Sequence, residues 1–264
     1  MECITSRKNP SVQQAARLLS SAAFRQEQGM FLAEGARLCR DAVRSGLAVP
    51  AAYFTAKALE KYPAYAEEIR QAAQTVYVVE PHVAGLLSDT KSPQGIFCVC
   101  RIPGLPEGLP PQARAALALE NMQDPGNLGT VLRTAEALGV DGVVLGGACC
   151  DPFGPKALRA SMGAVFRLPV LVEMDLPCAL ERWGRQGWRT MAAVPDTGAI
   201  PVTQADFSQP ALVVVGNEGN GLTPETLQVC GERVTIPMRG RAESLNAASS
   251  AAILLWEMMR TRTG

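Results

Sequence analysis

The stretch Leu212-Val-Val-Val215-Gly-Asn-Glu-Gly-Asn-Gly221 decides the fold class of this chain. Its unbroken run of β-branched valines, 213–215, is typical of a strand that is buried on both faces, as in a parallel sheet. Glycines follow the strand at once, and glycine allows positive φ angles and close approach of the backbone to a ligand. In open parallel sheets, ligands bind beyond the carboxyl ends of the strands. The stretch therefore predicts a central parallel strand that runs into a ligand-binding loop.

Strand and helix patterns alternate on both sides of this stretch. Strands are expected at 30–34, 51–55, 75–80, 95–100, 115–120, 142–145, 168–172, 189–194, 212–215 and 233–236. Helices are expected at 11–24, 35–46, 128–138, 156–162, 177–185, 224–229 and 245–260. This alternation predicts an α/β fold with a parallel sheet.

A proline- and glycine-rich segment divides the chain. Residues 101–111 contain four prolines and two glycines, a composition that resists both helix and central strand. We therefore expect a small α/β domain at 1–100, a linker at 101–114 and a larger domain at 115–264, which are ordinary domain sizes.

Composition excludes several classes of protein. The 264 residues are 47% hydrophobic, which is enough for a core, and the formal net charge of zero excludes a highly basic nucleic-acid coat but not a local basic face. His82 is the only histidine and no C-x-x-C occurs among the eight cysteines, so no metal site is expected. The polar start of the chain and the short, interrupted apolar stretch 247–259 predict a soluble, reduced, cytoplasmic protein without a membrane span.

The loop after the strand at 115–120 carries the first candidate site. Asp124-Pro-Gly126 is a turn, and Asn127 is interpreted as the N-cap of the following helix. Arg133 lies off the apolar stripe of that helix, one turn beyond Gly129, so its guanidinium can reach the loop end, where free N–H groups favour anions. A solvated helix arginine and an ordinary cap are the alternative interpretation.

Two further loops carry polar residues at the same edge of the expected sheet. The spacing of Gly216, Glu218 and Gly221 differs from a dinucleotide-binding G-x-G-x-x-G, and a carboxylate suits hydroxyls or positive charge better than a pyrophosphate. Ser244 and Asn246 make the start of the last helix more polar than packing requires. A glycine-rich turn and an ordinary helix cap are the alternatives for each loop alone.

Together these residues resemble the three motifs of the SpoU/TrmH family of RNA ribose 2′-O-methyltransferases, in the SPOUT superfamily. The matching positions are Asn121, Asp124, Pro125, Asn127, Gly129 and Arg133; Gly216, Glu218 and Gly221; and Ile236, Pro237, Met238, Gly240, Ser244, Leu245 and Asn246. The N-terminal part is similar to the ribosomal-protein-like RNA-binding domain of such enzymes, at Arg25, Gly29, Phe31, Glu34, Gly35 and 87–95.

The resemblance implies a deep trefoil knot at the C-terminal end of the sheet, bound S-adenosylmethionine, and a homodimer formed through the catalytic domain. It implies that Gly216, Gly221, Ile236, Met238 and Leu245 hold the cofactor. The implied catalytic residues are Asn127, Arg133, Glu218, Ser244 and Asn246. Methyl transfer to a hydroxyl is an in-line displacement, in which positioning dominates.

Arg133 has a chemical role that can be argued from its residue type. The family assigns it the activation of the hydroxyl, but an arginine with a pKa above about 12 is a poor free base. We therefore expect Arg133 to grip the target phosphate and to stabilise the developing alkoxide. The proton acceptor is not identified by the sequence.

The expected partner is RNA, and large-subunit (23S) ribosomal RNA in particular, because family members with this N-terminal domain mostly act on it. The candidate phosphate contacts are Arg7, Lys8, Arg17, Arg25, Arg37 and Arg40. The alternatives are a transfer RNA 2′-O-methyltransferase, a non-catalytic RNA-binding relative, and a nicotinamide- or nucleotide-dependent enzyme. A role in antibiotic resistance stays open as well.

Overall fold

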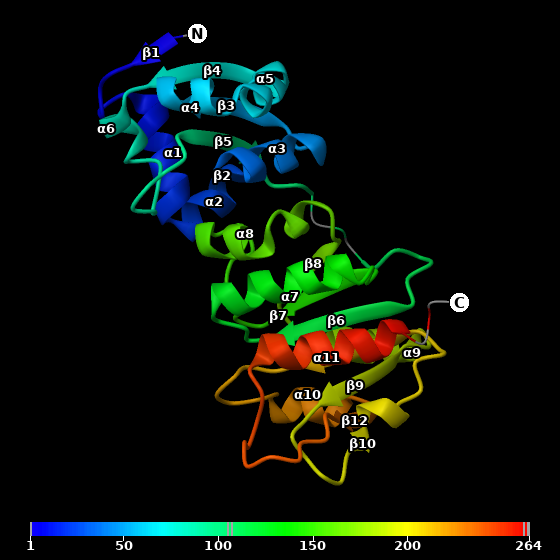
Figure 1. The fold of residues 1–264 in the computed structure, drawn as a ribbon. Coiled ribbons are helices and arrows are strands. Elements are labelled where there is room, and N and C mark those ends of the chain that lie inside the picture. The colour runs from blue at the N-terminus through cyan, green and yellow to red at the C-terminus, as the bar shows by residue number, and fades with distance from the viewer. Residues whose placement is uncertain (1, 105, 107, 261, 263–264) are drawn as a thin grey trace. The chain divides into compact units, whose positions relative to one another are not determined.

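Two sheets organise the computed structural model, which describes residues 2–104, 106, 108–260 and 262 (Figure 1). Each sheet belongs to its own compact unit. Unit 1 comprises Met1–Gly104 and Phe153–Phe166. Unit 2 comprises Leu105–Pro152 and Arg167–Gly264.

The sheet of unit 1 has five strands in the order β1-β4-β3-β5-β2. The strands are β1 (Glu2–Ile4), β2 (Met30–Glu34), β3 (Val49–Phe54), β4 (Ala73–Val79) and β5 (Ile96–Arg101). β1, β3 and β4 pair in parallel, whereas β5 runs antiparallel to β2 and β3. The helices are α1 (Pro10–Ser20), α2 (Ala22–Gln28), α3 (Ala36–Arg44), α4 (Ala56–Lys61), α5 (Pro63–Ala72) and α6 (Pro81–Ala84).

The prediction of a single helix at 11–24 is wrong, because the chain forms two helices that meet at Ser21. This residue is extended, with φ −124° and ψ 113°, and its backbone N–H donates to the Arg17 carbonyl at the end of α1. Its hydroxyl accepts from the Phe24 N–H at 3.2 Å and so caps α2. A serine that caps one helix cannot also continue the previous one.

Residues 153–166 belong to unit 1, although the expected division placed them in a continuous domain at 115–264. They form α8 (Pro155–Ser161) and a short 3₁₀ turn, η1 (Ala164–Phe166). The rings of Phe153 and Phe166 lie 5.1 Å and 5.6 Å from the ring of Phe31 on β2. Aromatic packing of this kind explains why the segment associates with the first sheet.

The sheet of unit 2 has seven parallel strands in the order β10-β12-β9-β11-β6-β7-β8. The strands are β6 (Ala115–Glu120), β7 (Gly142–Gly146), β8 (Val170–Glu173), β9 (Arg189–Ala193), β10 (Ile200–Pro201), β11 (Ala211–Val215) and β12 (Glu232–Thr235). β11 lies at the centre, with Val213 opposite Leu117 on one side and Met191 on the other. The predicted α/β fold with a buried, parallel valine strand is confirmed.

Helices cover both faces of this sheet. They are α7 (Pro125–Ala137), α9 (Leu176–Arg185), α10 (Pro224–Val229) and α11 (Ala247–Arg260), with a 3₁₀ turn η2 (Val202–Gln204). Leu180 and Trp183 of α9 pack in one cluster with Leu212 and Val214. Because side chains alternate along a strand, Val213 faces the opposite side, where α7 and α11 contact each other. In the described part of the chain, none of the helices has the length and apolar character needed to cross a membrane.

The helix expected at 128–138 begins earlier, at Pro125, and its N-cap is Asp124 rather than Asn127. The Asp124 carboxylate accepts from the Asn127 backbone N–H at 2.8 Å. Pro125 occupies the first helical position, where its fixed φ suits a helix and no N–H is needed. This correction leaves the Asn127 side chain available for contacts with other loops.

Candidate functional site

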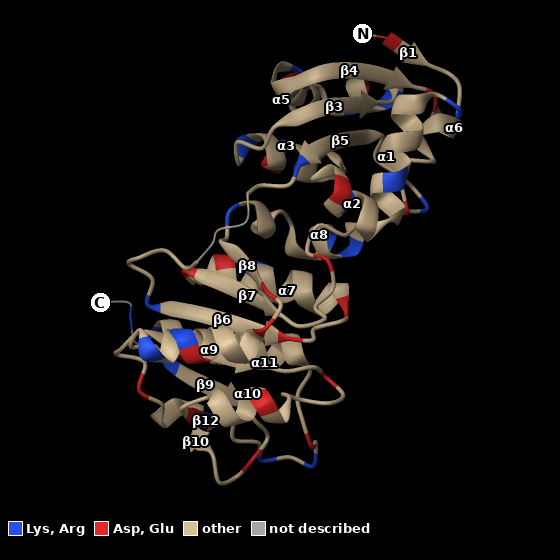
Figure 2. Cartoon of the chain, turned by 180° about the vertical axis from the view of Figure 1, so that it is seen from behind, with Lys and Arg blue, Asp and Glu red and all other residues tan. Residues whose placement is uncertain are grey.

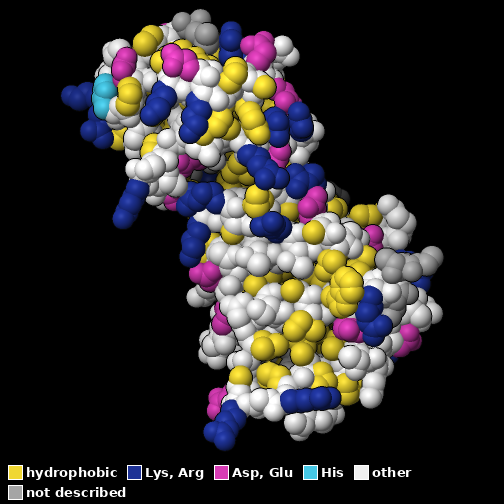
Figure 3. Space-filling model, in the orientation of Figure 1, with side chains coloured by type: hydrophobic (Ala, Val, Ile, Leu, Met, Phe, Trp, Pro, Cys, Tyr) yellow, Lys and Arg dark blue, Asp and Glu magenta, His cyan; other side chains and the backbone are white. Residues whose placement is uncertain are grey.

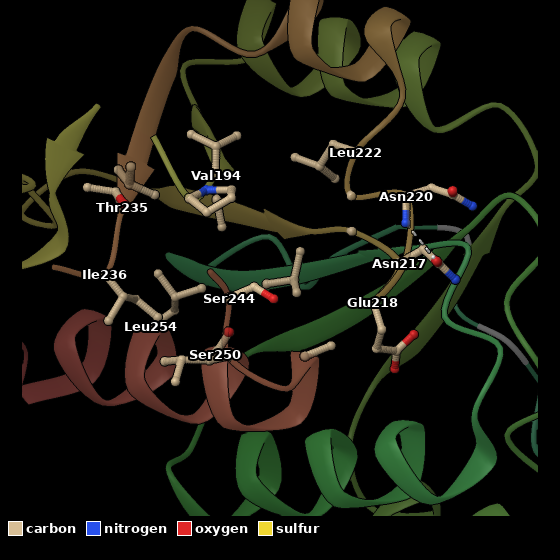
Figure 4. A pocket seen from close by; sticks show the side chains of 18 of the residues that line it. Val194, Asn217, Glu218, Asn220, Leu222, Thr235, Ile236, Ser244, Ser250 and Leu254 are labelled. Atoms are coloured by element: carbon tan, nitrogen blue, oxygen red, sulfur yellow. Dashed lines mark hydrogen bonds between the residues drawn. The ribbon is translucent and has the colours of Figure 1, made fainter. Parts of the chain in front are cut away.

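A cavity of about 500 Å³ lies at the carboxyl ends of β9, β11 and β12, beside α11 (Figure 4). Its volume is within the usual range for small-molecule sites. The five residues predicted to hold a cofactor all line it, namely Gly216, Gly221, Ile236, Met238 and Leu245. Glu218 and Ser244, from the predicted catalytic set, line it as well.

Gly216 is the position at which the cavity wall depends most strictly on glycine. A Cβ atom there would lie 2.5 Å from Leu222 N and even closer to the Gly221 carbonyl group. Asn217 and Gly221 form a small antiparallel bridge, with hydrogen bonds of 3.1 Å and 2.9 Å between their backbones. The loop therefore folds back on itself and presents its backbone to the cavity, a shape that a side chain at position 216 would prevent.

Three of the predicted catalytic residues form one hydrogen-bonded chain, although they come from three different loops. Asn246 Nδ2 donates to Asn127 Oδ1 at 3.2 Å. Asn127 Nδ2 donates in turn to Glu218 Oε1 at 2.6 Å. Asn246 also caps α11, because its Oδ1 accepts from the backbone N–H groups of Ala248 and Ser249. This series of hydrogen bonds joins the start of α7, the loop at 216–221 (the glycine loop) and the start of α11.

The other two predicted catalytic residues, Ser244 and Arg133, are not part of this series of hydrogen bonds. Ser244 is exposed at the cavity, where Figure 4 shows it near Ser250 and Ile236. Arg133 is exposed on α7 and, within the part of the chain that the structure describes, has neither a hydrogen bond nor an ion pair. Its guanidinium therefore keeps its donors available for an anion.

Glu120, the last residue of β6, and Asn121, which follows it, contact the loop at 216–223; sequence reasoning named Asn121 as a motif position but missed Glu120. Glu120 is 3% exposed, and its carboxylate accepts hydrogen bonds from Thr223 and Thr226. The Asn121 carbonyl accepts from Asn217 Nδ2 at 3.0 Å, and Asn121 itself has a φ of +56°. The available signal was a carboxylate that ends an otherwise apolar buried strand, since such a group needs partners.

The nearby cysteines are neutral thiols. Cys149 donates to the carbonyls of Leu119 and Gly146 at 3.3 Å and 3.2 Å, and burial raises its pKa. Burial also raises the pKa of Cys150 and of Cys230 to about 12. Among the described residues no group of three or more histidine, cysteine or acidic side chains is placed to hold a metal ion.

One of the predicted RNA contacts in unit 1 is corrected by the structure. Arg25 is only 5% exposed, and its guanidinium donates to the Leu18 and Leu19 carbonyls at 2.6 Å and 3.3 Å. It therefore satisfies free carbonyls at the C-terminal end of α1 and is not a surface contact. Of the others, Arg7, Lys8 and Arg37 are exposed, Arg17 lies over the Phe24 ring at 4.0 Å, and Arg40 lies over the Tyr65 ring.

Basic and acidic residues occur along both units (Figure 2). In the face shown in Figure 3, several basic side chains gather on the part of the molecule that contains β1–β5. This agrees with the zero net charge of the chain, because phosphate contacts would have to be local.

Comparisons with known proteins match both parts of the chain. A model of the SpoU rRNA Methylase family matches residues 114–256. A model of the MRM3-like substrate binding domain matches residues 9–98. The chain is 37% identical to an uncharacterized tRNA/rRNA methyltransferase of Synechocystis, over 97% of this chain and 93% of the relative.

Two further relatives carry more specific names. The Bacillus subtilis 23S rRNA (guanosine(2553)-2′-O)-methyltransferase RlmP is 36% identical, over 69% of this chain and 71% of its own length. The Streptomyces viridochromogenes 23S rRNA (uridine(2479)-2′-O)-methyltransferase is 31% identical, over 98% of this chain and 92% of its own.

Solved structures resemble the whole chain. An AdoMet-bound rRNA methyltransferase from Sinorhizobium meliloti has a TM-score of 0.87 and 30% identity, and the match covers 100% of this chain and 99% of that one. The SpoU methyltransferase AviRb of Streptomyces viridochromogenes, in complex with AdoMet, has a TM-score of 0.85 and 28% identity, with 97% and 98% covered. Sequence and fold agree, and the chain belongs to the SpoU rRNA methylase family.

Proposed function

We propose that the protein methylates a ribose 2′-hydroxyl of 23S ribosomal RNA with S-adenosylmethionine as methyl donor. The observation that carries this proposal is the chain from Asn246 through Asn127 to Glu218, beside a cavity of about 500 Å³. The names of the Bacillus subtilis and Streptomyces viridochromogenes relatives support the reaction and the substrate. The two AdoMet-bound neighbours support the cofactor.

The cavity fits S-adenosylmethionine in its size and in the chemistry of its lining. Val194, Leu222 and Leu254 provide apolar walls, whereas the turned-back glycine loop provides backbone donors and acceptors. The missing Cβ at Gly216 lets the backbone of Gly221 and Leu222 pack closely against it, and this keeps the loop turned back beside the cavity. When bound, S-adenosylmethionine supplies a methyl group on a positively charged sulfur, and the Glu218 carboxylate is a favourable neighbour for that charge.

Arg133 and the hydrogen-bonded residues have separate roles in the reaction. Arg133, which has no hydrogen-bond or ion-pair partner among the residues that the structure describes, holds the phosphate next to the target ribose, where it also stabilises the alkoxide that develops on the hydroxyl. Asn127, Glu218, Ser244 and Asn246 orient the hydroxyl and the methionine part of the cofactor. Because Asn127 and Asn246 hold each other, the orientation is set before the substrates arrive.

Unit 1 is the RNA-holding part in this proposal. Residues 9–98 match a substrate-binding domain, and the exposed Arg7, Lys8 and Arg37 offer phosphate contacts. Recognition then rests on the shape of the RNA and on splayed nucleotides. The substrate places the enzyme in the cytoplasm.

The enzyme works as a homodimer that associates through α11. Trp256 is 57% exposed on this helix and Ile253 is 37% exposed, while the partly exposed Ala252 is small enough to allow another helix to approach. Figure 3 shows apolar side chains over the face where α11 lies in Figure 1. Large exposed apolar groups on a helix mark an interaction surface. The trefoil knot that is implied by the family resemblance belongs to the same proposal.

The test is methyl incorporation from labelled S-adenosylmethionine into unmodified ribosomal and transfer RNA, with nucleoside mass analysis of the product. A 2′-O-methyl nucleoside in 23S rRNA that is lost in Arg133→Ala supports the proposal. Methylation of transfer RNA alone would overturn the substrate. Cofactor binding without transfer to any RNA, assembled or free, would favour a non-catalytic relative, and no cofactor binding would overturn the methyltransferase function itself.

A further inference from the structure

Glu120 is a buried carboxylate at the end of an apolar strand. It is 3% exposed at the last position of β6, and no ion pair to it occurs among the residues that the structure describes. Burying a charge is costly unless hydrogen bonds compensate for it. An apolar side chain at the end of this otherwise apolar strand would avoid that cost, so the carboxylate needs a reason beyond packing.

The partners of Glu120 all belong to the segment that follows the glycine loop. Oε2 accepts from the Thr223 backbone N–H at 2.7 Å. Oε1 accepts from the Thr223 hydroxyl at 2.8 Å and from the Thr226 hydroxyl at 2.5 Å. The Thr223 hydroxyl also accepts from the Thr226 N–H and so caps α10. Glu120 therefore determines where the loop ends and where α10 begins.

The next residue in the chain holds the other end of the same loop. The Asn121 carbonyl accepts from Asn217 Nδ2 at 3.0 Å, and Asn217 Oδ1 accepts from the N–H groups of Gly219 and Asn220. The last residue of β6 and the residue that follows it thus hold the loop 216–223 at its end and at its start. β6 is the direct neighbour of β11 in the sheet, which is why it can reach both ends.

We propose that Glu120 is a positioning residue that, together with Asn121, sets the shape of the cofactor loop 216–223. Glu120 is not among the described residues that line the cavity, so it acts through the loop. The inference rests on the proposed function, because the loop it positions is the one that would hold S-adenosylmethionine. Without this acceptor, the loop loses the three hydrogen bonds that fix its end at Thr223 and Thr226.

The experiment compares Glu120→Ala, Glu120→Gln and Glu232→Ala in the full-length chain. S-adenosylmethionine affinity is measured by calorimetry, and hydrogen exchange is measured over residues 216–223. Glu120→Ala removes the acceptor and is expected to raise the Kd for the cofactor by roughly 10-fold or more, with faster exchange of the Thr223 amide. It is expected to raise the KM for the cofactor and not the KM for RNA.

Glu120→Gln is the conservative variant that is expected to restore most of the affinity. Its oxygen can accept from the Thr223 N–H, while its NH₂ group donates to the two threonine hydroxyls, which rotate to accept. Glu232→Ala is the matched control, because Glu232 is also a partly buried carboxylate in this sheet but lies at the amino end of β12, paired with Arg189. It is expected to lower the melting temperature and to leave the cofactor Kd unchanged.

A folded Glu120→Ala variant with wild-type cofactor affinity would overturn the proposal, as would an equal rise of the Kd in Glu232→Ala. If Glu120→Ala does not fold, Thr226→Val removes one of the three hydrogen bonds with little change in volume. It is then expected to raise the Kd and the exchange rate of the loop, and unchanged values would overturn the proposal. Failure of the wild-type chain to bind S-adenosylmethionine would overturn the proposed function instead, and hydrogen exchange would still test the positioning role.

Discussion

Asn127 donates a hydrogen bond of 2.6 Å from its side-chain amide to the carboxylate of Glu218, a residue 91 positions later in the chain. The other end of the same amide accepts from Asn246, and the Asn127 backbone N–H donates to Asp124. One residue therefore connects the start of α7 with the two loops that border the cavity. Three of the proposed catalytic residues are thus held together without a ligand, which is the condition for catalysis by positioning.

Asn127→Asp is expected to lower methyl transfer by about 100-fold, because a carboxylate would face the Glu218 carboxylate in place of a donor. Single-turnover rates at saturating cofactor measure this loss. Asn127→Ala is the control, since it removes the donor without adding charge, and α7 keeps its Asp124 cap through the backbone. The explanation fails if Asn127→Asp is the more active of the two variants.

Arg133→Ala is expected to lower turnover by about 100-fold or more, with cofactor affinity retained, because in our proposal Arg133 acts on the RNA and on the developing alkoxide. Arg133→Lys keeps the charge and loses the planar pair of donors, so it is expected to recover only part of the rate. Rates in saturating RNA and calorimetry of cofactor binding separate these effects. Near wild-type turnover of Arg133→Lys would refute bidentate binding.

Gly216→Ala is expected to weaken cofactor binding by roughly 10-fold or more and to lower stability, because the new Cβ would overlap the backbone of Gly221. Calorimetry and a thermal melt measure both effects. Gly184→Ala in α9 is the matched control, because nothing lies within 4 Å of the added Cβ there. It is expected to be neutral or slightly stabilising, since alanine favours the helix.

Arg25→Met is expected to reduce the free energy of unfolding by about 2 kcal/mol, because hydrogen bonds from a charged donor to the α1 carbonyls are lost. It is expected to leave the salt dependence of RNA binding unchanged. Arg7→Ala removes an exposed charge, and if Arg7 contacts a phosphate the slope of log K against log salt falls by about 0.7–0.9. Urea unfolding and RNA titrations at several salt concentrations test the contrast, which an altered slope in Arg25→Met would contradict.

Alkaline pH is expected to destabilise the fold. Burial raises the pKa of Cys150 and Cys230 to about 12, so the folded chain keeps these thiols protonated where the unfolded chain ionises them. Their contribution to stability is complete below the unfolded pKa of about 8.5 and is lost as the pH rises toward 12. Urea midpoints at about pH 7 and about pH 10 measure the decline. A double variant with alanine at both positions should decline less steeply, and an identical decline would speak against these thiols as the cause.

The parallel sheet and the position of the site were predictable, because both depend on local patterns. The valine run at 213–215 identifies a doubly buried strand, and the glycines after it mark the loop at its carboxyl end. The N-cap of α7 could also have been predicted from the sequence, since Pro125 at the first helical position favours Asp124 over Asn127 as the cap. Both residue types cap helices well, and composition alone therefore did not separate them.

Contacts between residues that are far apart in the chain were decided only by the tertiary structure. Arg25 is the same residue type as the exposed Arg37, and only the packing of α1 and α2 buries it. Residues 153–166 belong to unit 1 because the rings of Phe153 and Phe166 pack against the ring of Phe31. Glu120 accepts hydrogen bonds from the segment after the loop at 216–223 because β6 and β11 are neighbours in the sheet. Periodicity and turn chemistry act over a few residues and can be read from the sequence, whereas burial and partner choice depend on strand order, which only the folded chain establishes.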